Sequence, residues 1–154
     1  MKKLFILFFA SLMIVSCSKN KVFEKFEKFE NYDWNMDQSL KFEVSIIDTA
    51  VAYNIYIPVR HTDNYPYDCL MINVNINTPV GEERNKNYKL NFRNSDGKFI
   101  GEGLGDIWDE KNMIMGNIKF KNTGIYKFEI LNNMPKTPTQ GIMELGLSVE
   151  KNNQ

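Results

Sequence analysis

The sequence is poor in the residues that build metal centres and catalytic sites. Its 154 residues include two cysteines and one histidine, so a histidine-rich metal centre is excluded. No Gly-x-Ser-x-Gly stretch is present, which removes the signature of the nucleophile elbow of serine hydrolases. Basic and acidic side chains are equal in number, 19 of each, and this balance predicts no general affinity for nucleic acid or for anionic lipid.

Long hydrophobic runs are also absent, except for one near the start of the chain. Leu4 to Val15 is an almost unbroken apolar run of twelve residues that follows Lys2 and Lys3. As a helix this run would rise about 18 Å, whereas a bilayer core is about 30 Å thick. A short basic segment followed by a short apolar segment is typical of a secretory signal rather than of a transmembrane helix.

The residues that end this run predict a lipid anchor. Cys17 follows the stretch Ile14-Val15-Ser16, and lipoprotein signal peptidases cut between a small residue and a cysteine that carries diacylglycerol. One acyl chain binds a membrane only marginally, whereas two chains hold a protein stably. We therefore predict removal of residues 1–16, lipid attachment at Cys17 and a mature protein held on a membrane.

Residues 17–36 are expected to form a tether, followed by one folded domain over residues 37–154. Within the tether, Phe23, Phe26 and Phe29 recur at every third residue. This spacing fits a short amphipathic helix lying on the membrane. We favour the alternative that the Phe side chains pack the chain onto the domain, because the segment is short and not basic.

Alternation of apolar and polar residues predicts strands along the rest of the chain. The expected strands are 40–46, 51–59, 70–76, 88–92, 114–120, 126–130 and 143–149. Gly, Asn and Pro mark the turns between them, and no segment keeps a helical period over three turns. Many short alternating strands predict an all-β fold, a single antiparallel β-sandwich of jelly-roll type.

Two residues have structural rather than chemical expectations. Tyr126 follows a glycine turn and fits a corner tyrosine, whose hydroxyl ties a loop to the strand. Because Cys17 carries lipid, Cys69 is the only thiol left and no internal disulfide can form. Cys69 precedes an apolar run and should be half-buried and inert.

Few side chains offer chemistry. His61 could join Asp63 and a serine in a triad, but we interpret it as a loop histidine beside a turn. Asp106, Asp109 and Glu110 lie near glycines and could hold Ca²⁺, although their spacing is not that of an EF-hand. Asp106 and Asp109 could also be imagined as a glycosidase pair. The glycines beside these acidic residues are explained by tight turns alone, without a bound ion. We expect no catalytic residue, no metal and no cofactor.

Another group of side chains could stack on a sugar ring. It lies between the second and third expected strands, with Trp108 near in some foldings, and comprises Arg60, Asp63, Tyr65, Pro66 and Tyr67. The simpler interpretation, which we favour, is that Tyr and Pro stiffen a long loop. Arg60 would then pair with Asp63.

Several stretches together resemble a known family over nearly the whole mature length. The first are Phe29-Glu30-Asn31 with Trp34, Tyr53-Asn54-Ile55-Tyr56-Ile57, and Arg60 with Thr62-Asp63-Asn64-Tyr65-Pro66-Tyr67. The later ones are Asp96-Gly97-Lys98, Gly101-Glu102-Gly103-Leu104-Gly105-Asp106-Ile107, Gly124-Ile125-Tyr126-Lys127-Phe128-Glu129-Ile130 and Gly146-Leu147-Ser148-Val149-Glu150-Lys151. In this order they resemble the gliding motility lipoprotein GldH family.

The resemblance implies a lipoprotein that cells need for gliding over surfaces and that works with envelope machinery linked to type IX secretion. It implies no reaction and no cofactor, so Cys17 is the one site that transfers. We expect a non-catalytic assembly factor whose partners are the membrane and other envelope proteins; the alternative is a lipid-anchored glycan-binding module. Ser18 after the cysteine and a tether without early acids predict an outer-membrane protein that faces the periplasm.

Overall fold

The computed structural model describes residues 20–152, and these form strands with a single 3₁₀ turn, Glu30–Tyr32. The early strands are β1 (Lys21–Lys28), β2 (Asp33–Trp34), β3 (Leu40–Ile46), β4 (Ala52–Thr62) and β5 (Cys69–Asn77). The later strands are β6 (Glu83–Asn91), β7 (Glu102–Leu104), β8 (Ile107–Ile118), β9 (Gly124–Asn132), β10 (Thr139–Gln140) and β11 (Ile142–Asn152). No helix among the described residues is long and apolar enough to cross a membrane.

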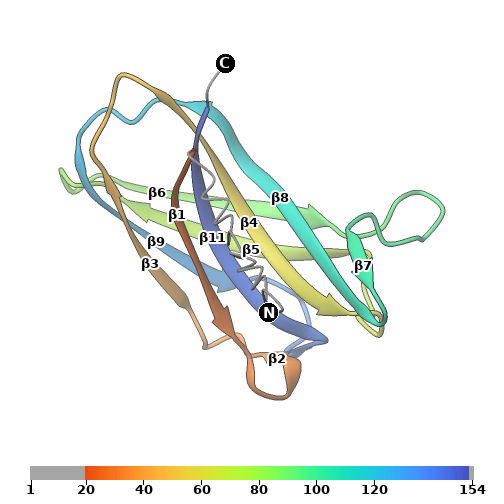
Figure 1. Cartoon of the computed structure of the whole chain (residues 1–154). Helices are drawn as coiled ribbons and strands as arrows, with labels where there is room; N and C mark the ends of the chain where they lie inside the picture. Colours follow the sequence, from red (N-terminus) through yellow and green to blue (C-terminus); the bar gives the residue numbers. More distant parts are fainter. Residues whose placement is uncertain (1–19, 153–154) are drawn as a thin grey trace, which may run out of the picture.

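The strands form two packed antiparallel sheets (Figure 1). The five-stranded sheet has the order β1-β11-β4-β8-β7, and the four-stranded sheet has the order β3-β9-β5-β6. A short third ladder joins β2 to β10. The antiparallel β-sandwich predicted from the alternating pattern is therefore confirmed.

The inner faces of both sheets supply the core. In β3 every second residue is buried, from Leu40 to Ile46, and β4 repeats this pattern from Tyr53 to Val59. Because successive side chains of a strand point to opposite faces, the alternation in the sequence becomes one apolar and one wet face. Each fully buried Val, Leu, Ile or Phe is worth about 1.5–3 kcal/mol, so the core holds the sheets together without a disulfide.

The structure differs from the expected tether in its later part. Residues 21–28 form edge strand β1, which pairs with β11 from Lys21 opposite Glu150 to Lys28 opposite Glu144. The amphipathic helix is therefore wrong, and packing onto the domain is confirmed. The rings supply that packing: Phe23 contacts Phe42, and Phe29 stacks on Trp34 with ring centroids 5.3 Å apart. The predicted signal peptide, Cys17 and the first tether residues lie outside the described residues.

The sandwich has two ends, which differ in their distance along the chain from Cys17. The proximal end is the one at which β1 begins, and it carries the connections 47–51, 78–82 and 119–123. The distal end carries the connections 63–68, 92–101, 105–106 and 133–138. In Figure 1 the proximal connections lie at upper left, and β7 and the end of β4 lie at lower right.

Candidate functional site at the distal end

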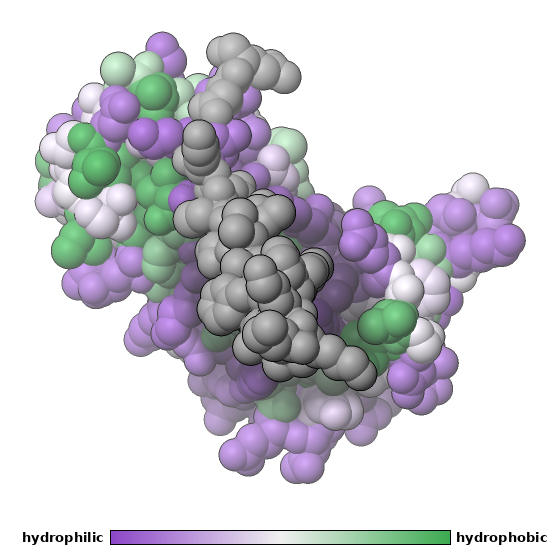
Figure 2. Space-filling model, viewed as in Figure 1, coloured by the Kyte–Doolittle hydropathy of each residue, from purple (hydrophilic) through white to green (hydrophobic). Residues whose placement is uncertain are grey.

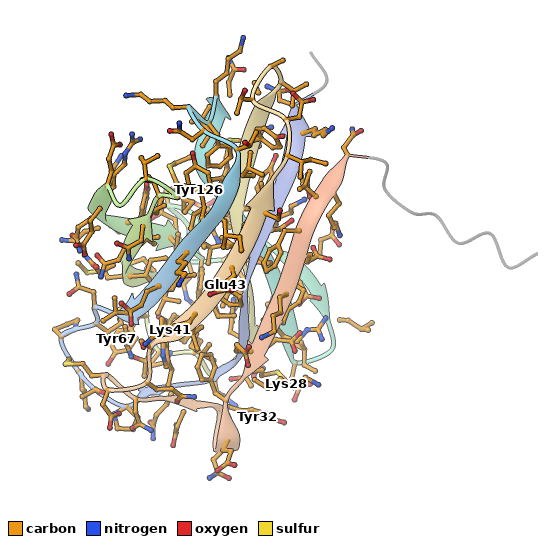
Figure 3. The ribbon with its side chains drawn as sticks, turned by 90° about the vertical axis from the view of Figure 1, so that its left-hand side faces the viewer. Lys28, Tyr32, Lys41, Glu43, Tyr67 and Tyr126 are labelled. Atoms are coloured by element: carbon orange, nitrogen blue, oxygen red, sulfur yellow. The ribbon has the colours of Figure 1, made fainter. Side chains whose placement is uncertain are left out.

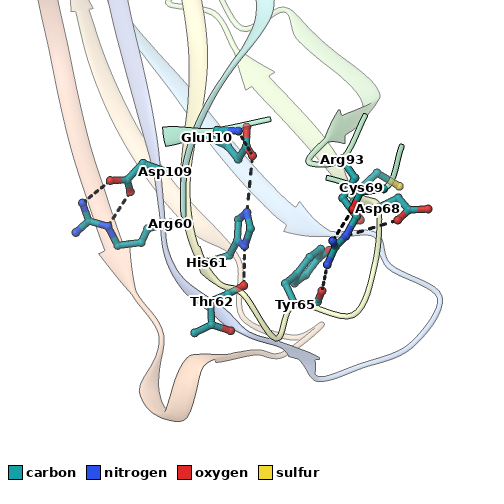
Figure 4. Close-up of polar contacts among 11 residues, drawn as sticks. Arg60, His61, Thr62, Tyr65, Asp68, Cys69, Arg93, Asp109 and Glu110 are labelled. Carbon is teal, nitrogen blue, oxygen red and sulfur yellow. Dashed lines mark hydrogen bonds and ion pairs between the residues drawn. The ribbon is translucent and has the colours of Figure 1, made fainter. Parts of the chain in front are cut away.

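The residues that stood out in the sequence gather at the distal end, where β4 finishes and β8 begins. The ladder between these strands places Arg60 opposite Asp109 and His61 opposite Trp108. Neighbouring residues of each strand point to opposite faces. Arg60 and Asp109 therefore lie on the outer face of the five-stranded sheet, whereas His61 and Glu110 point into the sandwich (Figure 4).

On the outer face, Arg60 is the centre of an ion-pair network. Its Nε and Nη2 donate to the two carboxylate oxygens of Asp109 at 2.7 and 2.9 Å, and its Nη1 lies 3.1 Å from Glu144 Oε1. The hydrogen bonds that Arg60 donates to the Asp109 carboxylate raise the pKa of Arg60. The expected pair between Arg60 and Asp63 is wrong, because the β4–β8 ladder sets Asp109 directly opposite. The Arg60–Asp109 pair remains solvent-exposed and is worth about 0–1 kcal/mol.

His61 lies in β4 and is fully buried, so its interpretation as a loop residue is wrong. Its ring stacks on Phe92, with centroids 4.6 Å apart and planes 5° from parallel. Its Nδ1 lies 2.8 Å from the carbonyl oxygen of Thr62. A carbonyl can only accept, so Nδ1 carries the hydrogen and donates it.

Glu110 faces the other ring nitrogen of His61. Its Oε1 lies 3.8 Å from His61 Nε2, which is close enough for an ion pair but too far for a hydrogen bond. The same oxygen accepts the backbone N–H of Gly101 at 2.9 Å. The two ring nitrogens thus face a carbonyl and a carboxylate, not the hydroxyl that a Ser-His-Asp triad needs.

The acidic residues proposed for calcium are not brought together. Asp109 and Glu110 project from opposite faces of β8, and both oxygens of Asp109 bond Arg60. Within residues 20–152 no group of three or more His, Cys, Asp or Glu side chains is placed to hold a metal ion. Asp106 joins the neighbouring loop through its backbone, since its carbonyl accepts the N–H of Asp63 at 2.8 Å.

The loop that was considered for sugar stacking turns its main ring inward. Tyr65 is buried, and its hydroxyl donates to the carbonyl of Cys69 at 2.8 Å. Burial raises the pKa of the Tyr65 phenol. Arg93 reinforces the loop, because its Nη2 donates to the Tyr65 carbonyl at 3.3 Å (Figure 4). Tyr65 therefore stiffens the loop, as the simpler interpretation proposed, and presents no face to a sugar ring.

The β7–β8 hairpin supplies an exposed apolar tip that sequence reasoning missed. Leu104 is 86 % exposed and precedes Gly105, whose φ of 66° suits a tight turn. Gly103 leaves room for the indole of Trp108, since a Cβ built there would lie 2.9 Å from the ring. An apolar residue between two glycines, Gly103-Leu104-Gly105, was the available signal. Figure 2 shows hydrophobic residues gathered at this end.

A hollow of about 550 Å³ lies on the outer face beside this hairpin. Its lining combines apolar surface from Phe26, Pro58 and Ile100 with the charges of Arg60 and Asp109. Apolar surface around a few convergent polar groups is the usual composition of a binding site. The distal end can therefore bind a partner through exposed Leu104 and the Arg60 network, whereas His61, Glu110 and Tyr65 hold its shape from inside.

Two structural expectations are confirmed away from this surface. Tyr126 donates its hydroxyl to the carbonyl of Asn122 at 3.0 Å, which ties the 119–123 connection to β9 as a corner tyrosine does (Figure 3). Cys69 is half-buried and free, at the start of β5. Its inertness stays a prediction.

The chain is similar to known lipoproteins over nearly its whole length. A family model described as GldH lipoprotein matches residues 21–149, a range that starts at the first residue of β1. The gliding motility lipoprotein GldH of Flavobacterium johnsoniae is 29 % identical over 153 residues, covering 95 % of this chain and 94 % of that protein. A gliding motility lipoprotein GldH homolog of Christiangramia forsetii is 28 % identical over 154 residues, covering 96 % of this chain and 94 % of that protein.

Proposed function

The chain belongs to the GldH lipoprotein family, and we propose that it is a lipid-anchored component of the bacterial gliding motility machinery. The observation that carries this proposal is the match of two gliding motility lipoproteins along almost their full length. We place its lipid on Cys17 and its work alongside type IX secretion. In this role it assembles envelope proteins and catalyses no reaction.

The position of Cys17 supports a protein that binds its partner through the distal end. Three residues lie between it and the start of β1 at Lys21, and the four extended steps from Cys17 to Lys21 reach at most about 14 Å. The proximal end must then stay close to the membrane. β4 has eleven residues and runs from the proximal to the distal end, which is roughly 33 Å at about 3.3 Å per residue. The distal surface is thereby held out where an envelope partner can reach it.

The chemistry of the distal end supports binding rather than catalysis. The imidazole of His61 stacks on Phe92 and contacts the tilted ring of Phe99, and its two nitrogens are directed at Thr62 and Glu110. A general acid or base must lie within hydrogen-bond reach of a substrate. The His61 ring is fully buried and therefore lies out of reach of one. The exposed groups are Leu104 and the Arg60–Asp109 pair, which are suited to recognition of a protein surface.

Deletion of the gene in a gliding host tests the proposal. We expect the deletion strain to lose colony spreading and to secrete type IX cargo poorly, and wild-type protein should restore both. A Leu104→Asp variant should be stable but restore them only partly, because it places a charge on the distal surface. Met113→Asp is the matched control, since Met113 is also exposed but lies midway along β8. Normal spreading and secretion in the deletion strain would refute the proposal.

The anchor has its own test. Cys17→Ser should abolish incorporation of radiolabelled fatty acid and leave an uncleaved or mislocalised precursor. Cys69→Ser should keep the label, because Cys69 belongs to the folded domain. Label in the Cys17→Ser protein would contradict the anchor.

We place the protein on the periplasmic side of the outer membrane. Ser18 follows the lipid-bearing cysteine, and the tether Ser18-Lys19-Asn20-Lys21 has no acidic residue. Protease added to intact cells should therefore leave the protein whole, and it should degrade the protein once the outer membrane is opened. Digestion of the protein in intact cells would show instead that it is exposed on the cell surface.

A further inference from the structure

The proximal end carries exposed apolar side chains at the tips of its connections. Ile47 is 78 % exposed and Val80 is 60 % exposed. Pro79 brings the β5–β6 connection against the start of β9, because a Cβ built on Gly124 would lie 2.9 Å from Pro79 Cβ. Ile125, which follows Gly124, is half exposed and borders the same hollow as Pro79. Hydrophobic residues are visible at this end at the upper left of Figure 2.

Single exposed apolar residues are common on soluble proteins, so the charges around them matter. The acidic residues of the proximal connections have basic partners: Asp48 lies 3.9 Å from Lys151, and Glu82 lies 3.3 Å from Arg84. The β8–β9 connection instead carries Lys119 and Lys121, both exposed, and neither forms an ion pair within the described part of the chain. The β8–β9 connection therefore carries two positive charges that form no ion pair within the described part of the chain.

These two lysines border apolar surface. They lie at the rim of a cleft of about 300 Å³ that opens at the proximal end between the two sheets. Ile76, Met115 and Ile118 are among its lining residues. Cationic side chains beside apolar ones are typical of segments that lie at the boundary between lipid headgroups and acyl chains.

We infer that the proximal end of the sandwich rests on the membrane, with Ile47 and Val80 at the headgroup–acyl boundary and Lys119 and Lys121 on anionic headgroups. The inference rests on the proposed lipid at Cys17. That anchor lies within about 14 Å of Lys21 when the intervening residues are extended, and the headgroup layer is itself about 5–8 Å deep on each side. The short reach therefore brings the proximal tips to the lipid.

The alternative is a domain that lies on its side, with the outer face of the five-stranded sheet on the lipid. That face carries charges that are already paired, including Arg60 with Asp109 and Lys111 with Glu150 at 2.7 Å. Contact with lipid would strip water from these pairs, which costs free energy without a compensating partner. The end-on arrangement buries apolar tips and uses free lysines, so it is favoured.

Fluorescence quenching in vesicles distinguishes the two arrangements. The full lipidated protein, in a Cys69→Ser background, carries an environment-sensitive dye at one introduced cysteine. Val80→Cys reports the proximal end, Met113→Cys the sheet face, and Leu104→Cys the distal hairpin. The vesicles contain phosphatidylcholine and phosphatidylglycerol with brominated acyl chains, and the control vesicles lack bromine.

We expect brominated lipid to quench emission at position 80 and to leave position 104 unchanged, because the distal end is roughly 33 Å farther out. The double variant Lys119→Glu/Lys121→Glu should reduce quenching at position 80. Its matched control is Lys98→Glu/Lys136→Glu, two exposed lysines in distal connections, which should have no effect.

Each outcome decides between the inference and its premise. Stronger quenching at position 113 than at position 80 would establish the side-on arrangement and overturn the inference. Equal quenching at positions 80 and 104 would also overturn the inference, while leaving the lipid anchor intact. A wild-type chain that does not float with vesicles would remove the anchor, and the inference would fall with it. Loss of spreading in the deletion strain is a separate readout that none of these results changes.

Discussion

Truncation of Glu110 should be one of the most destabilising changes at the distal end. The side chain is 5 % exposed, accepts the Gly101 N–H at 2.9 Å and faces the fully buried His61. Glu110→Ala leaves the Gly101 N–H without its acceptor, at about 1–3 kcal/mol, and removes His61's carboxylate partner. A loss of about 1–3 kcal/mol is a large share of a domain stability of about 5–15 kcal/mol.

Urea unfolding followed by tryptophan fluorescence measures this loss, with buried Trp34 as reporter. Glu110→Gln keeps an oxygen acceptor and the volume of the side chain, so it should cost less than Glu110→Ala. Asp109→Ala is the control on the same strand, because Asp109 points to solvent and its pair with Arg60 contributes only about 0–1 kcal/mol. A cost for Asp109→Ala as large as that for Glu110→Ala would refute the reasoning.

Three further predictions concern other parts of the sandwich. Gly146→Ala places a Cβ 2.6 Å from a backbone oxygen of β1, so it should lower the free energy of unfolding by about 1–3 kcal/mol and speed hydrogen exchange in β1. Gly116→Ala is the control and should cost less, because its Cβ comes close only to a flexible methionine sulfur. Equal costs would count against the close approach of β1 to β11. Tyr126→Phe should lower the free energy of unfolding by about 1 kcal/mol, because the corner hydrogen bond is lost, and an unchanged urea midpoint would contradict it. The hydrogen bond from Ser39 is the main cause that lowers the pKa of Glu129, so Ser39→Ala should raise that pKa in a carboxyl NMR titration. A depressed carboxyl pKa stabilises the fold above the unfolded pKa and ceases to do so as pH falls through the folded value, so the variant should also lose less stability on acidification.

The sequence predicted strands well wherever one face is buried and the other is wet. The alternation in 40–46 gave the bounds of β3 directly, because that strand has one face on the core along its whole length. β6 was predicted only from Tyr88 onward. Its first residues, Glu83 to Asn87, are all exposed, so no apolar period marks them. β1 was not predicted for a related reason: it is an edge strand whose residues are all exposed or half-buried, so no buried face marks it.

The distal site could be predicted only in part. Its residues drew notice as a set of polar and aromatic types, but their roles depend on a ladder that joins positions 49 apart, as for Arg60 and Asp109. Within β8 no strand was predicted before residue 114, because the inward positions at the start of β8 include Trp108 and Glu110, which break the apolar alternation. Polar groups inside a sheet are recognised only when their partners are known, and His61 supplies that partner from another strand.

Adjacent residues of β8 thus serve the distal end in opposite ways. Glu110 fixes the 92–101 connection to the sheet through Gly101, and this connection carries Ile100 to the rim of the hollow. Asp109 lies on the outer face, where its pair with Arg60 is exposed and costs little to rearrange. The buried carboxylate therefore sets the shape of the surface, and the exposed one is free to exchange its partner. The partner-binding role proposed above would use both properties, a distal end of fixed shape and charges that can exchange their partners.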